Sequence, residues 1–204
     1  MSQVKWRVPE RPYADSVSTS NSPHDRRPPA PGAHDGFQVL DACHRQTVVA
    51  LDRLEALVDR LQAGDVDAQA KAWATEAMEH FSNVARQHHQ DEELHVFPRL
   101  VSSADAEIVQ AVLRLQQDHY WLEEDWLEIS PQVDSIACGM SFDLDLLRET
   151  VAVFVALSRD HIALEESLLY PEARAVTGTG ERREMGREMA ARRRAARKPV
   201  RRPT

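Results

Sequence analysis

The 204-residue sequence has few cysteines and no long apolar run, and each shortage excludes a class of protein. Its two cysteines, Cys43 and Cys138, are too few and too far apart for a disulfide framework or a Cys-x-x-Cys pair. No segment approaches the roughly 18 consecutive apolar residues of a membrane-spanning helix, and residues 1–10 lack the apolar stretch of a secretory signal. We therefore expect no membrane association and a location in the reducing cytoplasm.

Proline and charge are distributed unevenly and divide the chain into three parts. Residues 1–36 hold six of the 11 prolines and show no apolar periodicity, so we expect a disordered arm. Residues 37–174 have long periodic apolar stretches and almost no glycine, which predicts the folded domain. Residues 175–204 form a basic tail, expected to be flexible or partly helical, on a chain with a net charge of −8.

Four amphipathic helices are predicted in the folded domain. They cover about 37–63, 68–97, 104–129 and 142–170. In each range apolar residues recur at alternating steps of four and three and form one seam along the helix. The expected ends are Gly64, Pro98, Pro131 and Pro171. Four helices of this length with one apolar seam each predict an all-α fold, an antiparallel up-down four-helix bundle.

Every seam is interrupted by a histidine, and two seams carry a glutamate one turn later. The interrupting residues are His44, His88, Glu92, His119, His161 and Glu165. Burying an imidazole or a carboxylate without a partner costs several kcal/mol, so six such groups in one small core need a common partner. Because residues four apart are neighbours on a helix, each His-x-x-x-Glu pair can direct a nitrogen and an oxygen to one spot.

An internal repeat brings these groups together. His44 precedes His88 by 44 residues and His119 precedes His161 by 42, so we expect two pseudo-repeated helical hairpins. Aligning HHQDEELHVFP with HIALEESLLYP places Glu92 over Glu165, Glu93 over Glu166 and Phe97 over Tyr170. Facing hairpins would converge four imidazoles and two carboxylates. Nitrogen and oxygen donors without thiolate suit iron or manganese, with zinc possible, and a dinuclear centre is expected.

The motifs LDACHRQ, HHQDEELHVFP, QDHYWLEE and DHIALEESLLYP resemble the four motif helices of the hemerythrin-like, or HHE cation-binding, domains. The resemblance covers about residues 37–174. It implies two non-haem iron ions, with an oxo or hydroxo bridge and bridging carboxylates, and with dioxygen, nitric oxide or peroxide as small ligands. The implied metal ligands are His44, His88, Glu92, His119, His161 and Glu165.

One position departs from the oxygen-carrying hemerythrins, which have a second histidine on the third helix four residues after the first. Here that residue is Glu123, so the five-histidine set is incomplete and open coordination positions remain. Open positions bind small ligands but also let water and superoxide leave. This favours sensing, iron handling or peroxide and nitric oxide reactivity over oxygen storage, and Glu123 as a seventh ligand would weaken the argument.

Further residues near the motifs are interpreted as accessory. His95 is expected behind the ligands or at the edge of the pocket, and whether it also binds metal stays open. His89 and Glu93 form another His-x-x-x-Glu pair, which we expect on the outer face. His80 is expected at the surface, and Cys43 as a small buried apolar residue.

Three functions are compatible with this sequence. A protein that binds a small redox ligand in sensing, iron handling or stress response is preferred, because no acid–base pair separate from the metal ligands is visible. The first alternative is a di-iron enzyme that consumes peroxide or nitric oxide or oxidises iron. The second is a metal-stabilised interaction module whose basic tail binds a polyanion; nucleic-acid binding is expected only through that tail.

Overall fold

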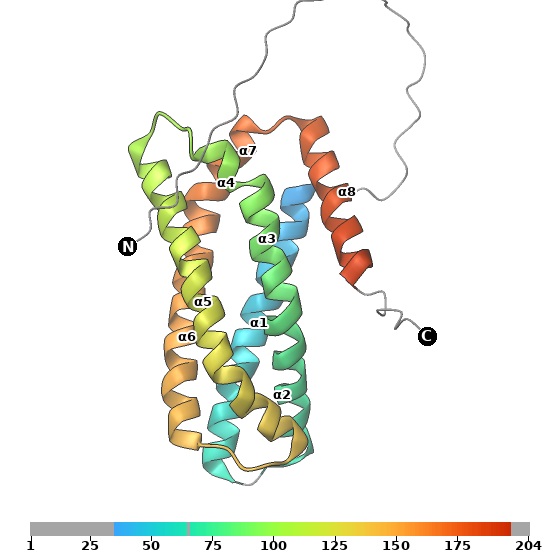
Figure 1. The fold of residues 1–204 in the computed structure, drawn as a ribbon, viewed down its shortest axis with the longest axis vertical. Coiled ribbons are helices and arrows are strands. Elements are labelled where there is room, and N and C mark those ends of the chain that lie inside the picture. The colour runs from blue at the N-terminus through green and yellow to red at the C-terminus, as the bar shows by residue number, and fades with distance from the viewer. Residues whose placement is uncertain (1–34, 65, 197–204) are drawn as a thin grey trace, which may run out of the picture. The chain divides into compact units, whose positions relative to one another are not determined.

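The computed structural model describes residues 35–64 and 66–196, and Figure 1 shows them as a set of packed helices. The elements are α1 (Gly36–Ala63), α2 (Ala68–Glu79), η1 (His80–Ala85), α3 (Arg86–His95), α4 (Phe97–Leu100), α5 (Ala106–Cys138), α6 (Leu144–Leu164), η2 (Glu165–Leu169), α7 (Tyr170–Val176) and α8 (Thr179–Ala196). These ranges contain no strand, in agreement with the predicted all-α class. Nearly all of the predicted N-terminal arm lies outside the described residues.

Within the described residues, four long helical rods make up the bundle, and two of them are each built from several consecutive elements. α2, η1 and α3 follow one another without a break, as do α6, η2 and α7, and the η segments are π-helical. These rods pack with α1 and α5 into a helical bundle: α2 lies against α5, α5 against α6, and α1 against both α2 and α6. In the described ranges no helix combines the length and apolarity that crossing a membrane requires.

An aspartate begins each of the four longest rods. Its carboxylate accepts a hydrogen bond from a backbone N–H two or three residues later. The capping residues are Asp35, Asp67, Asp105 and Asp143. Such caps satisfy backbone donors that the helix itself leaves free and typically contribute about 1 kcal/mol each. At the other end of α5, Gly139 has φ 69°, a left-handed conformation in which glycine readily ends a helix.

α5 is longer than the sequence predicts. We expected the third helix to end at Pro131, but α5 continues to Cys138 with the proline in its interior. An interior proline loses a backbone hydrogen bond and costs about 3 kcal/mol or more. The prediction was wrong because the apolar seam continues past the proline: Ile129, Val133 and Ile136 are all 0% exposed. Their burial offsets the cost of the proline.

The residues after the bundle include a helix that packs back onto it. α8 lies against α1 and α3 and buries Met185 and Met189. A Cβ atom at Gly36 would lie 2.4 Å from Cγ of Met185, so glycine at the start of α1 permits this close approach. The described part of the predicted tail is therefore a packed helix.

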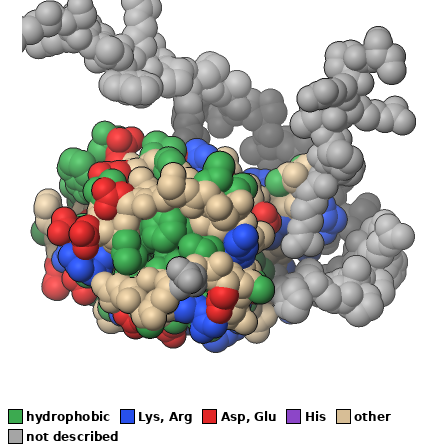
Figure 2. Space-filling model, turned by 90° about the horizontal axis from the view of Figure 1, so that it is seen from below, with side chains coloured by type: hydrophobic (Ala, Val, Ile, Leu, Met, Phe, Trp, Pro, Cys, Tyr) green, Lys and Arg blue, Asp and Glu red, His purple; other side chains and the backbone are tan. Residues whose placement is uncertain are grey.

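Two separate apolar cores lie along the bundle. The first core includes Leu51, Leu122 and Val155, and the second includes Leu40, Leu115 and Leu169. Figure 2 looks at the end where α5 leads into α6, and hydrophobic side chains gather in its middle. Half-buried Phe142 in this connection packs against the first core. The stretch of the bundle between the two cores is polar.

Candidate metal centre

The polar layer between the two cores consists of the six residues singled out in the sequence. They come from α1 (His44), α3 (His88 and Glu92), α5 (His119), α6 (His161) and η2 (Glu165). Each is at most 5% exposed, and both glutamates are 0% exposed. In α1 the layer follows Leu40 of the second core, and in α5 it follows Leu115 of the same core. The structure therefore brings all six together inside the bundle.

The six residues form two groups of four that share both glutamates. One group is His44, His88, Glu92 and Glu165, and the other is Glu92, His119, His161 and Glu165. Within each group the candidate ligand atoms all lie within 4.8 Å of one another. Each group alone offers two imidazoles and two carboxylates.

Each shared carboxylate faces both groups with different oxygen atoms. Oε2 of Glu165 lies 3.1 Å from Nε2 of His44, and its Oε1 lies 3.2 Å from Nε2 of His161. Oε1 of Glu92 lies 3.4 Å from Nε2 of His88, and its Oε2 lies 3.4 Å from Nε2 of His119. This is the arrangement that two carboxylates bridging a pair of cations require.

The layer contains polar atoms that protein partners do not satisfy. Nε2 of His88, His119 and His161 and both oxygens of Glu165 are buried and lack a hydrogen-bond partner among the described residues. Buried polar atoms are nearly always paired, so an inward-facing set of this kind fits bound cations. Imidazole and carboxylate donors without thiolate suit iron, manganese or zinc. The residues present therefore fit a pair of such ions.

Without bound metal, the titratable groups of the layer have pKa values shifted in different directions. Burial and the charge of Glu165 raise the pKa of Glu92 to about 7. Burial opposes ionisation of Glu165, but His161 and His44 hold the pKa of its carboxyl well below the usual range. Burial likewise opposes protonation of His161, yet Glu165 and Asp118 raise its pKa to about 10. Cations would compete with these protons, so their affinity should rise with pH.

The glutamates that follow the two shared carboxylates orient histidines of the opposite hairpin. Nδ1 of His119 donates to Oε1 of Glu93 at 3.0 Å, and Nδ1 of His44 donates to Oε1 of Glu166 at 3.0 Å. A carboxylate on Nδ1 fixes the tautomer and directs the Nε2 lone pair at the metal position. The hairpin alignment placed Glu93 over Glu166 without giving either a role.

Tyr170 and Asp118 are further contacts that the sequence analysis missed. The Tyr170 hydroxyl donates to Oε1 of Glu92 at 2.5 Å and lies 3.2 Å from Nε2 of His44. Oδ2 of Asp118 lies 3.7 Å from Nδ1 of His161. The only sequence signal for Tyr170 was the aromatic-Pro ending of both hairpins, which marks Phe97 equally.

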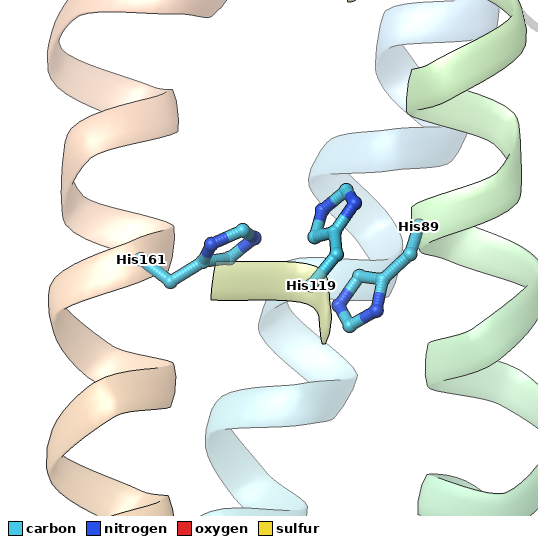
Figure 3. Close-up of side chains that lie close together, drawn as sticks. All are labelled: His89, His119 and His161. Atoms are coloured by element: carbon cyan, nitrogen blue, oxygen red, sulfur yellow. The ribbon is translucent and has the colours of Figure 1, made fainter. Parts of the chain in front are cut away.

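The prediction that His89 lies on the outer face of the bundle is wrong. Its ring stacks on His119 with centroids 4.1 Å apart and lies 5.6 Å from the ring of His161. Figure 3 shows these three rings, from α3, α5 and α6, turned toward one another. The expected pairing with Glu93 was wrong because that carboxylate contacts His119 instead.

Glu123 and His95, for which the sequence left metal binding open, both lie away from the layer. Glu123 has a half-exposed side chain and forms an ion pair with Arg86. His95 lies under α8, where its Nε2 is 2.8 Å from Nη2 of Arg192. Neither belongs to a group that could hold a metal ion in the described ranges.

A cavity of about 690 Å³ leads to the layer between η1, α3 and α5. Phe81, Trp126 and Phe154 form its apolar part, and the exposed Arg86–Glu123 pair also lines it. His44, His88, His119 and His161 are lining residues as well. A small molecule can therefore reach the candidate metal positions from this side.

His80 is half-buried, although the sequence predicts it at the surface. Its protonation should lower the free energy of unfolding. Nε2 of His80 donates to Oγ1 of Thr47 at 3.0 Å, and burial lowers the pKa of His80 to about 4. Since the unfolded chain binds the proton more tightly, this contribution is complete above pH 6.5 and is lost as pH falls toward 4. Between pH 7 and pH 5, His80→Gln should lose about 2 kcal/mol less unfolding free energy than wild type. Equal losses in urea denaturation would contradict this.

Comparisons with known proteins agree with the geometry. The profile of the family described as "Hemerythrin HHE cation binding domain" matches residues 35–173. An uncharacterized protein of Haemophilus influenzae is 29% identical over 157 residues, which cover 77% of this chain and 89% of that protein. The family match runs from α1 into α7 and includes all six residues of the layer.

Proposed function

Because the chain belongs to the hemerythrin HHE cation-binding domain family, we propose that it binds two non-haem iron ions that take up a small redox ligand. His44 and His88 hold one ion, and His119 and His161 hold the other. Glu92 and Glu165 bridge them. The observation that carries this proposal is that each glutamate faces both histidine pairs with separate oxygens.

An iron pair bound here supplies one-electron redox chemistry and Lewis acidity toward dioxygen, nitric oxide or peroxide. The residues of the chain position it. Glu93 and Glu166 keep the Nε2 atoms of His119 and His44 free for the ions. Phe81, Trp126 and Phe154 give the approach an apolar lining that limits water.

A ligand-binding or sensing role is supported better than catalysis. Tyr170 carries a proton close to the layer, but its hydroxyl donates to Glu92 and the residue does not line the cavity. The carboxylates outside the six proposed ligands that line the cavity already have partners: Glu93 accepts from His119, and Glu123 pairs with Arg86. This favours a binding role over acid–base catalysis. The unpaired thiols of Cys43 and Cys138 fit a reducing cytoplasm.

The antiparallel up-down topology of two related hairpins is part of this proposal. α1 and α2 are joined by residues 64–67, and α5 and α6 by residues 139–143. Such short connections support neighbouring helices that reverse direction. Both hairpins place a histidine on the first rod and a His-x-x-x-Glu pair on the second.

The polyanion alternative has less support. In α8, Arg192 and Arg193 contact Asp91 of the bundle and are not available to a nucleic acid. Glu184 pairs with Arg187, which further dilutes the basic surface. A salt-dependent shift on mixing with duplex DNA would revive this function.

The test is metal analysis of protein loaded anaerobically with ferrous iron, followed by its absorption spectrum in air. We expect about two irons per chain and the near-ultraviolet and visible bands of a bridged ferric pair. Selective retention of zinc or manganese, or of no metal, would contradict the proposal. Spectral change without consumption of peroxide or nitric oxide indicates a binding protein, whereas turnover indicates the enzyme.

A further inference from the structure

His89 lies directly after His88 on α3 but faces the other half of the polar layer. Candidate ligand atoms of His89, His119 and His161 lie within 4.8 Å of one another. Successive residues on a helix point about 100° apart, so the two adjacent histidines diverge. His88 contributes to the group with His44, whereas His89 faces the group of the opposite hairpin (Figure 3).

The His89 ring stacks on His119, but its nitrogens have no hydrogen-bond partner among the described residues. None of the hydrogen bonds between described residues involves its nitrogens, and its helical neighbour Glu93 is bound to His119. The side chain is half-buried and lines the cavity together with His88, His119 and His161. Its nitrogens are therefore free to serve as a metal ligand.

We propose that His89 supplies a third imidazole to the ion held by His119 and His161. This inference rests on the proposed iron pair. The site would then have five imidazoles, although Glu123 on α5 replaces the second histidine of that helix. The fifth imidazole comes from α3 instead.

The repeat shows that this ligand serves one ion only. The hairpin alignment that superimposes His88 on His161 places His89 over Ile162, whose side chain cannot bind a metal. The ion at His119 and His161 then has three imidazoles and two carboxylates, and the ion at His44 and His88 has two of each. With roughly six positions per iron and one shared bridge, about one position stays open. An external ligand would therefore bind the ion at His44 and His88.

The test compares iron-loaded full-length wild type with His89→Ala, using His95→Ala as a control. The control removes another imidazole of α3 that lies under α8, outside the layer. X-ray absorption should show about five imidazoles per two irons in wild type and the control, and about four in His89→Ala. One iron should leave His89→Ala to a chelator about 10- to 100-fold faster than it leaves wild type. Added free imidazole should reverse both changes.

Several outcomes separate the two proposals. Two irons in wild type with the same imidazole count in His89→Ala would overturn the role of His89 alone. A wild type without two irons would overturn the proposed function itself. His89→Asn keeps a polar side chain of similar position, and metal-free circular dichroism of both variants tests the fold. A folded His89→Asn with four imidazoles supports the proposal, and one with five contradicts it.

Discussion

Replacing Glu165 with alanine is expected to remove both metal ions. Its two oxygens lie 3.1 Å from His44 and 3.2 Å from His161, so the change takes a ligand from each position and a bridge between them. Iron retained after loading and desalting should fall from about two per chain to well below one. The melting temperature should then no longer rise on loading, because metal binding and folding are coupled.

A glutamate outside the layer provides the control for this experiment. Glu123→Ala removes an exposed carboxylate that pairs with Arg86 and should retain both irons. Glu92→Ala and His161→Ala should also lose metal. Wild-type iron content in Glu165→Ala would contradict the bridging role and with it the dinuclear assignment.

Replacing both Arg192 and Arg193 with alanine should cause a large loss of stability. Nη2 of Arg192 and Nη2 of Arg193 contact the two oxygens of Asp91 at 2.5 and 2.8 Å, and Asp91 is only 1% exposed. The double variant leaves a buried carboxylate without its cations, which costs on the order of 3 kcal/mol. Urea denaturation of the metal-free protein measures this loss.

A second substitution tests whether the unpaired charge is the cause. Asp91→Asn in the double-variant background should recover part of the lost free energy, because the buried group no longer carries a charge. Arg187→Ala, which removes an arginine of α8 paired only with exposed Glu184, should change the free energy by less than about 1 kcal/mol. Absence of recovery by Asp91→Asn would assign the loss to packing of α8.

The sequence predicted the parts of this molecule that depend on periodicity. Alternating steps of four and three predicted four long helices, and the structure has helices in all four ranges. The six polar residues were recognisable because burying such groups without a partner is costly, and all six are buried in one layer. The family match confirms the resemblance that these motifs carry.

Features that depend on packing between distant segments were not predictable. The length of α5 is decided by burial beyond Pro131, which outweighs a local helix-breaking signal. The inward direction of the His89 side chain is evident only from its stacking on His119, a contact between α3 and α5. Packing of α8 depends on the pairing of Asp91 with arginines about 100 residues later, a contact that local patterns do not contain.

The hydrogen bonds of Glu93 and Glu166 across the two hairpins are consistent with an origin of this chain by duplication of one hairpin. Each hairpin supplies the carboxylate that orients a histidine of the other, as two copies of one ancestral hairpin would do around a two-fold axis. Joining the copies in one chain frees each to change independently. Tyr170 opposite Phe97 in the repeat is such a difference: a hydroxyl lies beside His44, whereas an apolar ring stacks on His119.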